Sequence, residues 1–127
     1  MFEEDYVMRI IREMVRALLK LLFGIDTENP SMELLRDQQM RERIAEMTRL
    51  IDEGHINEAE NHLYEVVDTD CREDLQMVLI FYSYLNELDN DYLEDHDYSR
   101  EEVKEGLQDM IERFGLKEMA DVYLLDL

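Results

Sequence analysis

The sequence GHINEA at residues 54–59, followed by Leu63, is typical of a tight turn between two antiparallel helices. Gly54 can end the first helix in the left-handed conformation, and the small Ala59 lets the second helix approach closely. The same spacing recurs 61 residues later, at Gly115, Ala120 and Leu124. We therefore expect two helical hairpins, with both alanines buried where their helices touch.

The composition also favours helices. Good helix formers such as Leu, Met, Glu and Arg are abundant, whereas the 127 residues include only four Gly and one Pro. A chain of this length can bury roughly two-thirds of its unfolded surface in one core. We predict an all-α fold and a single domain, residues 1–127, of about six helices arranged as antiparallel hairpins.

Apolar spacing, capping residues and glycines place the six helices. The predicted ranges are about 3–23, 30–53, 57–67, 72–88, 99–114 and 117 to the end. Asn29 is the expected cap of the second helix, and Pro30 fits its first turn. The pairs Asn57–Glu60 and Ser99–Glu102 resemble capping boxes for the third and fifth. Residues 89–98 are predicted to form an irregular acidic loop.

The run MVLIFY at residues 77–82 is apolar on nearly all sides. A buried strand is the alternative interpretation of so short a run. We favour a helix, because polar residues flank the run without turn signals and no partner strand is evident elsewhere. This helix and the first one are expected to supply most of the core.

The first helix combines a wide apolar arc with a narrow charged stripe. The stripe contains Arg9, Arg12, Glu13, Arg16 and Lys20. An arc this wide needs more than one neighbour. Three hypotheses follow: burial within the chain while the stripe pairs with acidic groups, homodimerisation through the arc, or a membrane-surface helix.

The net charge of −20 is unevenly distributed. Residues 1–24 hold four bases and four acids, so the remaining nine bases and 29 acids account for all of it. An acidic body repels nucleic acid and anionic lipid. We expect no nucleic-acid partner and no membrane partner, and a charged protein partner should be basic.

The redox and targeting signals favour a cytoplasmic protein. A single cysteine, Cys71, leaves no internal disulfide framework. Acidic residues occupy the positions where a secretory signal is positively charged, and Arg16 and Lys20 interrupt the longest apolar run. We expect neither a signal peptide nor a membrane span.

The hairpin at Gly54 resembles the second half of a tetratricopeptide repeat. In that family a Gly ends the first helix, a large apolar residue follows two positions later, and Ala comes five after the Gly; here these are Gly54, Ile56 and Ala59. The family's helix-ending Pro would fall at Cys71, and the 61-residue spacing is not its period of 34. The resemblance therefore implies tetratricopeptide-like hairpins and not a true repeat array.

The opening of the chain is also similar to an uncharacterised family of small acidic bacterial proteins. The residues that carry this resemblance are Asp5, Tyr6, Arg9, Ile11, Leu18, Leu19, Leu22, Phe23 and Gly24. Because that family is a domain of unknown function, the resemblance implies a bacterial origin and no particular chemistry.

Two groups of residues have the composition of metal sites but not the spacing. In the acidic segment 89–97, no register of a calcium-binding EF-hand loop places oxygen ligands, Gly and Glu at the required positions. Glu58, His62 and Glu65 share one helix face, but no Glu-x-x-His pair is present to build a di-metal site. We predict no metal ligands and no cofactor, with a solvated loop and an exposed polar face instead.

We also expect no catalytic residues. Acids surround Cys71 and oppose formation of a thiolate, so a buried or unreactive thiol is the better interpretation. The sequence lacks a nucleophile elbow, a catalytic-triad signature and a glycine-rich phosphate loop. An enzyme is a third hypothesis, which a deep pocket holding His62 or His96 beside two carboxylates would support.

The sequence therefore predicts a non-enzymatic protein-interaction module, an adaptor or regulator that holds a peptide or helix in a groove between hairpins. The alternative is an acidic decoy or inhibitor that binds a basic or nucleic-acid-binding protein in place of nucleic acid. A homodimer through the first helix stays open.

Overall fold

The computed structural model describes residues 2–124, which form helices and loops without any strand. The elements are α1 (Phe2–Phe23), the 3-10 turn η1 (Met32–Leu34), α2 (Gln38–Asp52), α3 (Ile56–Val66), α4 (Asp74–Asn86), α5 (Asn90–Asp95), α6 (Arg100–Arg113) and α7 (Lys117–Leu124). The all-α prediction is confirmed. None of these helices is both long enough and apolar enough to cross a membrane.

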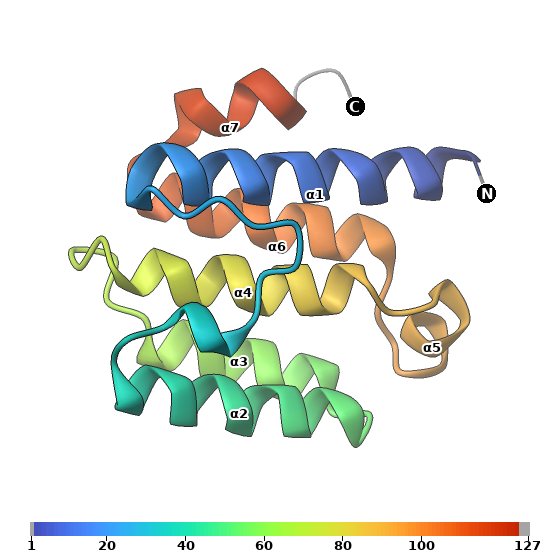
Figure 1. Ribbon diagram of the computed structural model, residues 1–127. Coiled ribbons are helices and arrows are strands. Elements are labelled where there is room, and N and C mark those ends of the chain that lie inside the picture. The colour runs from blue at the N-terminus through green and yellow to red at the C-terminus, as the bar shows by residue number, and fades with distance from the viewer. Residues whose placement is uncertain (1, 125–127) are drawn as a thin grey trace.

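Helix α4 is the central element of the fold. Ten of its 13 residues are buried, so water meets it along one narrow stripe only. Helices α1, α2 and α6 all pack against it. Figure 1 shows α1 and α6 on one side of α4, with α2 and α3 on the other. The helical interpretation of residues 77–82 is thus confirmed, and the strand alternative is wrong.

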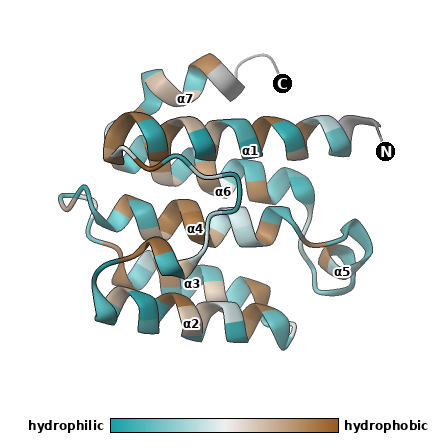
Figure 2. Ribbon diagram, viewed as in Figure 1, coloured by the Kyte–Doolittle hydropathy of each residue, from teal (hydrophilic) through white to brown (hydrophobic). Residues whose placement is uncertain are grey.

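Helix α1 buries its apolar arc within the chain, against α4, α6 and α7. The buried residues are Val7, Ile11, Met14, Val15, Leu18 and Leu19. Figure 2 shows brown and teal alternating along α1, as expected of a helix with one wet face. The structure therefore agrees with the first hypothesis for this helix. A dimer through α1 stays a prediction, and it would have to use other side chains, such as the exposed Leu21.

The two predicted hairpins are present. Helix α2 packs on α3 and α6 on α7, with Ala59 and Ala120 fully buried. Gly54 and Gly115 both have a positive φ. Figure 1 shows the α2–α3 hairpin and α7 at opposite edges of the molecule, separated by α4 and α1. The hairpins are therefore not successive units of a stacked array.

The second helix begins eight residues later than predicted. Pro30 belongs to an irregular segment, and α2 starts at Gln38, capped by the Asp37 carboxylate, which accepts bonds from the backbone N–H groups of Gln39 (2.8 Å) and Met40 (3.2 Å). Asn29 caps no helix; its N–H donates to the Thr27 hydroxyl. Residues 24–31, which lead from α1 to η1, pass in front of α4 (Figure 1). We call this stretch the crossing segment.

The predicted Asn57–Glu60 capping box is also wrong. Helix α3 begins at Ile56, and Asn57 is already inside its first turn. The Asn57 amide instead donates to the backbone carbonyl of Asp97 (3.3 Å), and Glu60 accepts a bond from the Tyr82 hydroxyl (2.5 Å). Both side chains are used in contacts between elements. By contrast, Ser99 caps α6 as predicted, accepting from the Glu102 N–H at 3.2 Å.

Part of the predicted acidic loop is helical. Residues Asn90–Asp95 form the short helix α5, held to the core by the fully buried Leu93. The Tyr92 hydroxyl donates to two carbonyls at the end of α2, those of Ile51 (2.6 Å) and Asp52 (3.1 Å). The turn after α5 therefore lies directly against the Gly54 turn.

Gly54 is required for two separate reasons. Its φ of +90° favours glycine, and a Cβ added there would lie 2.5 Å from Cδ2 and 2.6 Å from Nε2 of the His96 ring. That ring is itself fixed, because its Nδ1 lies 2.7 Å from the Tyr92 carbonyl oxygen. Gly24 and Gly115 also have positive φ, yet an added Cβ would meet nothing within 4 Å at either.

These three glycines allow a matched stability test. Substituting Ala at Gly24 or Gly115 should cost about 1 kcal/mol of unfolding free energy, the usual strain of a left-handed non-glycine residue. Gly54→Ala should cost about 1–3 kcal/mol more, because the methyl group also overpacks against His96. Urea unfolding followed by circular dichroism measures each variant.

The double variant isolates the imidazole contact. In a His96→Ala background the extra cost of Gly54→Ala should largely disappear, because the clash is removed while the backbone strain stays. An equal cost for Gly54→Ala with and without His96 would contradict this explanation of the turn.

Candidate functional site

A groove of about 650 Å³ runs between α1 and the second half of α4. Its α4 wall carries Ser83 and Tyr84, on the one stripe of that helix that reaches solvent within the described residues, and Glu87 follows directly after the helix. The crossing segment closes one end through Glu28, Asn29 and Pro30. The groove therefore exists because three helices and one irregular segment leave this stripe uncovered.

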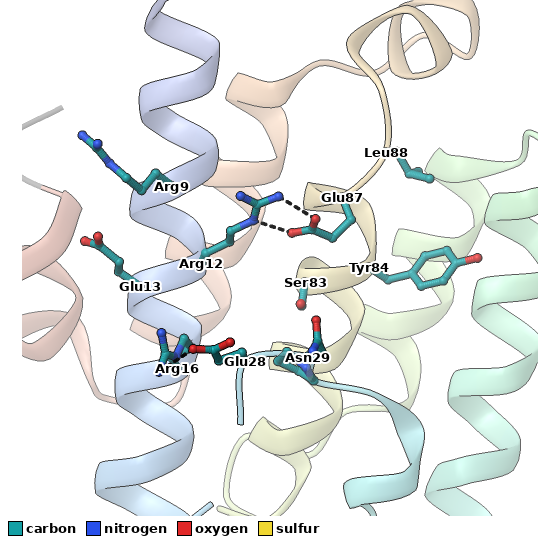
Figure 3. A pocket seen from close by; sticks show the side chains of 11 residues that line it. Arg9, Arg12, Glu13, Arg16, Glu28, Asn29, Ser83, Tyr84, Glu87 and Leu88 are labelled. Carbon is teal, nitrogen blue, oxygen red and sulfur yellow. Dashed lines mark hydrogen bonds and ion pairs between the residues drawn. The ribbon is translucent and has the colours of Figure 1, made fainter. Parts of the chain in front are cut away.

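The α1 wall carries the arginines of the basic stripe. The Arg12 guanidinium forms a two-pronged pair with the Glu87 carboxylate, at 2.7 Å from Nε and 2.6 Å from Nη2. This pair spans the groove from α1 to α4 (Figure 3) and raises the pKa of Arg12. Figure 3 also shows Arg9 and Glu13 pointing away from α4, toward the outer face of α1. Arg9 lies over the Tyr6 ring, 5.4 Å from its centroid.

The crossing segment contacts this stripe only loosely. Arg16 lies 3.8 Å from the Glu28 carboxylate and Lys20 lies 3.9 Å from that of Asp26, both too long for hydrogen bonds. The Glu28 side chain is 77% exposed. Exposed pairs of this kind contribute about 0–1 kcal/mol each. The guanidinium of Arg16 is therefore much less fully engaged than that of Arg12.

A second polar cluster lies inside the fold, between α3, α4 and α6. The half-buried Glu60 carboxylate accepts the bond from the buried Tyr82, and burial raises the pKa of Glu60 above its ordinary value. Burial also raises the pKa of Tyr82. Gly106 makes room for both groups, because a Cβ there would lie 2.5 Å from Glu60 and 2.6 Å from the Tyr82 hydroxyl. The cluster is enclosed by the fold and ties three helices together.

Another polar cluster, centred on Arg100, lies at the C-terminal end of α4. Arg100 is only 6% exposed, and its guanidinium donates to the carbonyls of Asn86 (2.5 Å) and Leu88 (2.6 Å) and to the Asn90 amide oxygen (2.8 Å). Desolvation lowers the pKa of Arg100. Because this arginine satisfies carbonyls that α4 leaves unpaired, its role is structural.

The residues weighed as metal ligands lie apart from these clusters. Glu58, His62 and Glu65 line an open hollow of about 480 Å³ between α2 and α3, beside Glu46 and Arg49. Within residues 2–124 no three His, Cys, Asp or Glu side chains are placed to hold a metal ion. Cys71 is partly exposed in the turn before α4. His96 packs on the Gly54 turn, as described above.

One end of the molecule gathers exposed acidic residues. The end of α2, the starts of α3 and α6, and the whole of α5 lie there, and α5 with its flanking loops is largely teal in Figure 2. The exposed acids are Asp52, Glu53, Glu58, Asp89, Asp91, Glu94, Asp95, Asp97, Glu101 and Glu102. We call this set the acidic end. The composition gives only the total negative charge, and the structure shows that ten of the acidic residues gather at this end.

Sequence reasoning identified one wall of the groove and missed the other. The arginine stripe follows from helical periodicity. A signal for the opposite wall was present, because Gln76, Ser83 and Glu87 are polar positions seven and four apart around an otherwise apolar helix. No periodic pattern in the sequence indicates where the crossing segment lies.

The comparisons with known proteins identify a family without a function. The model described as "Family of unknown function (DUF6483)" matches residues 1–115, and the chain belongs to this family. The match confirms the resemblance to an uncharacterised family, whereas the tetratricopeptide likeness is not confirmed. No curated protein and no solved structure matches the chain.

The buried carboxylate of Glu60 makes stability depend on pH. A carboxyl group whose pKa is raised by folding stabilises the protein most below its unfolded pKa, about 4.3, and this contribution is lost as the pH rises through the folded pKa. Ionised Glu60 therefore opposes folding near pH 7. Glu60→Gln keeps an oxygen acceptor for Tyr82, so it should be more stable than wild type near pH 7, with a difference that shrinks toward pH 4.

Urea unfolding across this pH range measures the effect. Glu65→Gln, which removes the same charge at an exposed position on the same helix, is the control. Parallel stability curves for Glu60→Gln and wild type at every pH would show that this carboxyl group is not strained by burial.

Proposed function

We propose that this chain is a non-enzymatic protein-interaction module, an adaptor or regulator, and that it holds a partner in the groove between α1 and α4. The supporting observation is the groove itself. It joins the arginines of α1 to Tyr84 and Leu88 on the opposite side. Arginine and tyrosine are among the residues that most often carry binding energy at protein interfaces.

The chemistry of the groove favours binding over catalysis. Its titratable side chains are three arginines, three glutamates and Tyr84. The Tyr84 hydroxyl donates to the Asp52 carboxylate, and burial with this contact raises the pKa of Tyr84 to about 12. Among the described residues, no histidine or cysteine lines the groove. A surface of paired charges with an apolar edge suits recognition of a polypeptide segment.

Two further parts of the proposal rest on the sequence. The resemblance to an uncharacterised family of small acidic bacterial proteins supports a bacterial origin, and the lone cysteine suits a reducing cytoplasm. The α2–α3 hairpin supports a tetratricopeptide-like packing limited to that one unit, with Ile56, Ala59 and Leu63 buried at its interface.

The acidic end favours a second candidate function. Ten exposed carboxylates on one end could bind a basic protein in place of nucleic acid, as a decoy or inhibitor would. This function predicts binding that weakens steeply between about 50 and 500 mM salt and that does not depend on the α1 arginines. The groove hypothesis instead predicts that binding is lost when the α1 arginines are replaced.

Charge reversal in the groove separates the two. Arg9→Glu with Arg16→Glu should abolish capture of partner proteins from a lysate of the source organism, because both guanidinium groups are exposed and neither anchors the fold. Arg12 is left intact, since it bridges α1 to α4. Quantitative mass spectrometry compares proteins retained by wild type and variant.

The control carries the same change in net charge at the other end of α4. Arg36→Glu with Arg72→Glu alters two exposed arginines outside the groove and should leave capture unchanged. Retention of the same partners by both double variants would overturn the groove hypothesis. If the retained partners were basic and were released by salt, that result would support the decoy instead.

A further inference from the structure

The crossing segment indicates what kind of chain the groove accepts. Within it, Asp26 and Glu28 face Lys20 and Arg16 on α1, and no regular hydrogen-bonded structure is present between residues 24 and 31. An irregular stretch with alternate acidic residues thus lies against the basic stripe. The chain itself supplies one example of an acidic segment placed beside these arginines.

The contact between the crossing segment and α1 leaves Arg9 and Arg16 without a close carboxylate partner. The Arg12–Glu87 pair, with distances of 2.6 and 2.7 Å, shows how closely a carboxylate can engage a guanidinium on this stripe. The carboxylate nearest Arg16 is 3.8 Å away, and Arg9 contacts the Tyr6 ring. Arg9 and Arg16 are seven residues apart, so they are separated by about 10 Å along the helix. Within the described residues neither guanidinium has a hydrogen bond to a carboxylate, and the Glu13 side chain between them points toward the outer face of α1 (Figure 3).

The rest of the groove adds an apolar requirement. Pro30 and Leu88 line it together with Tyr84, although the Tyr84 ring points away from α1 (Figure 3) and its hydroxyl donates to Asp52 on α2. A segment that places a carboxylate near Arg16 can therefore also bury an apolar side chain in the hollow beside α4. A guanidinium paired in two-pronged fashion with a carboxylate is stronger than a neutral hydrogen bond.

Resting on the proposed function, we propose that the partner segment is acidic and partly apolar, and that the crossing segment occupies part of its site in the free protein. The net charge of −20 does not oppose this. The Debye length is about 8 Å at physiological ionic strength, so the charges that line the groove matter most to a segment bound in it. Locally the groove balances three arginines against three glutamates. A segment with few carboxylates is favoured over a densely charged one.

A displayed library of random peptides tests this chemistry without knowledge of the partner. Selection on the wild-type chain should enrich peptides that contain acidic and apolar residues. Arg9→Glu with Arg16→Glu should lose these peptides, whereas Arg36→Glu with Arg72→Glu should keep them. Asp26→Asn with Glu28→Gln removes the competing carboxylates and should bind the selected peptides about 1.4- to 5-fold more tightly per contact freed, the effect expected of exposed ion pairs.

The outcomes distinguish this inference from the proposed function. Enrichment of basic or uncharged peptides that still depend on Arg9 and Arg16 would overturn the inference and leave the groove as the binding site. Peptides retained equally by both double variants, or no enrichment at all, would count against both. Weaker binding by the Asp26→Asn, Glu28→Gln variant would contradict competition by the crossing segment.

Discussion

The need to cover α4 on every side determines how the other elements are arranged. Residues 77–82 have no polar face, and burying such a helix requires neighbours all around it. Helices α1, α2 and α6 supply three of these neighbours. On the remaining side the crossing segment passes over α4, with the α1–α4 groove on one flank and a smaller hollow lined by Ile25, Leu35 and Gln76 on the other. The candidate site is thus a consequence of incomplete coverage.

Polar side chains fix the positions of these neighbours. Hydrophobic contact alone would tolerate several arrangements of helices around an apolar core. Tyr82 with Glu60 joins α4 to α3, Arg12 with Glu87 joins it to α1, and Arg100 joins its last turn to α6. Each of these bonds links residues distant in sequence. They give the bundle one arrangement, and the Arg12–Glu87 pair also spans the groove.

Local signals in the sequence were sufficient for much of this fold. The Gly and Ala of each hairpin act within one turn, and the Ser99 cap acts within three residues, so both could be predicted. Helix α5 could not, because its six residues depend on Leu93 reaching the core and on Tyr92 reaching the end of α2. The start of α2 could not be predicted either. Pro30 suits the first turn of a helix, but α2 is capped by Asp37, because the residues before it are needed to cross α4. In the candidate site, helical periodicity was sufficient to predict the arginine wall of the groove. The residues that face this wall depend on how α4 packs against α1.

Hydrogen exchange tests the central position of α4 most directly. If this helix is covered by its neighbours, the amides of residues 77–85 should be the slowest to exchange in the protein. They should open only with global unfolding, with a free energy equal to that from urea denaturation. The account would be contradicted if these amides exchanged as fast as those of α7, or through a local opening that leaves α1 and α6 protected.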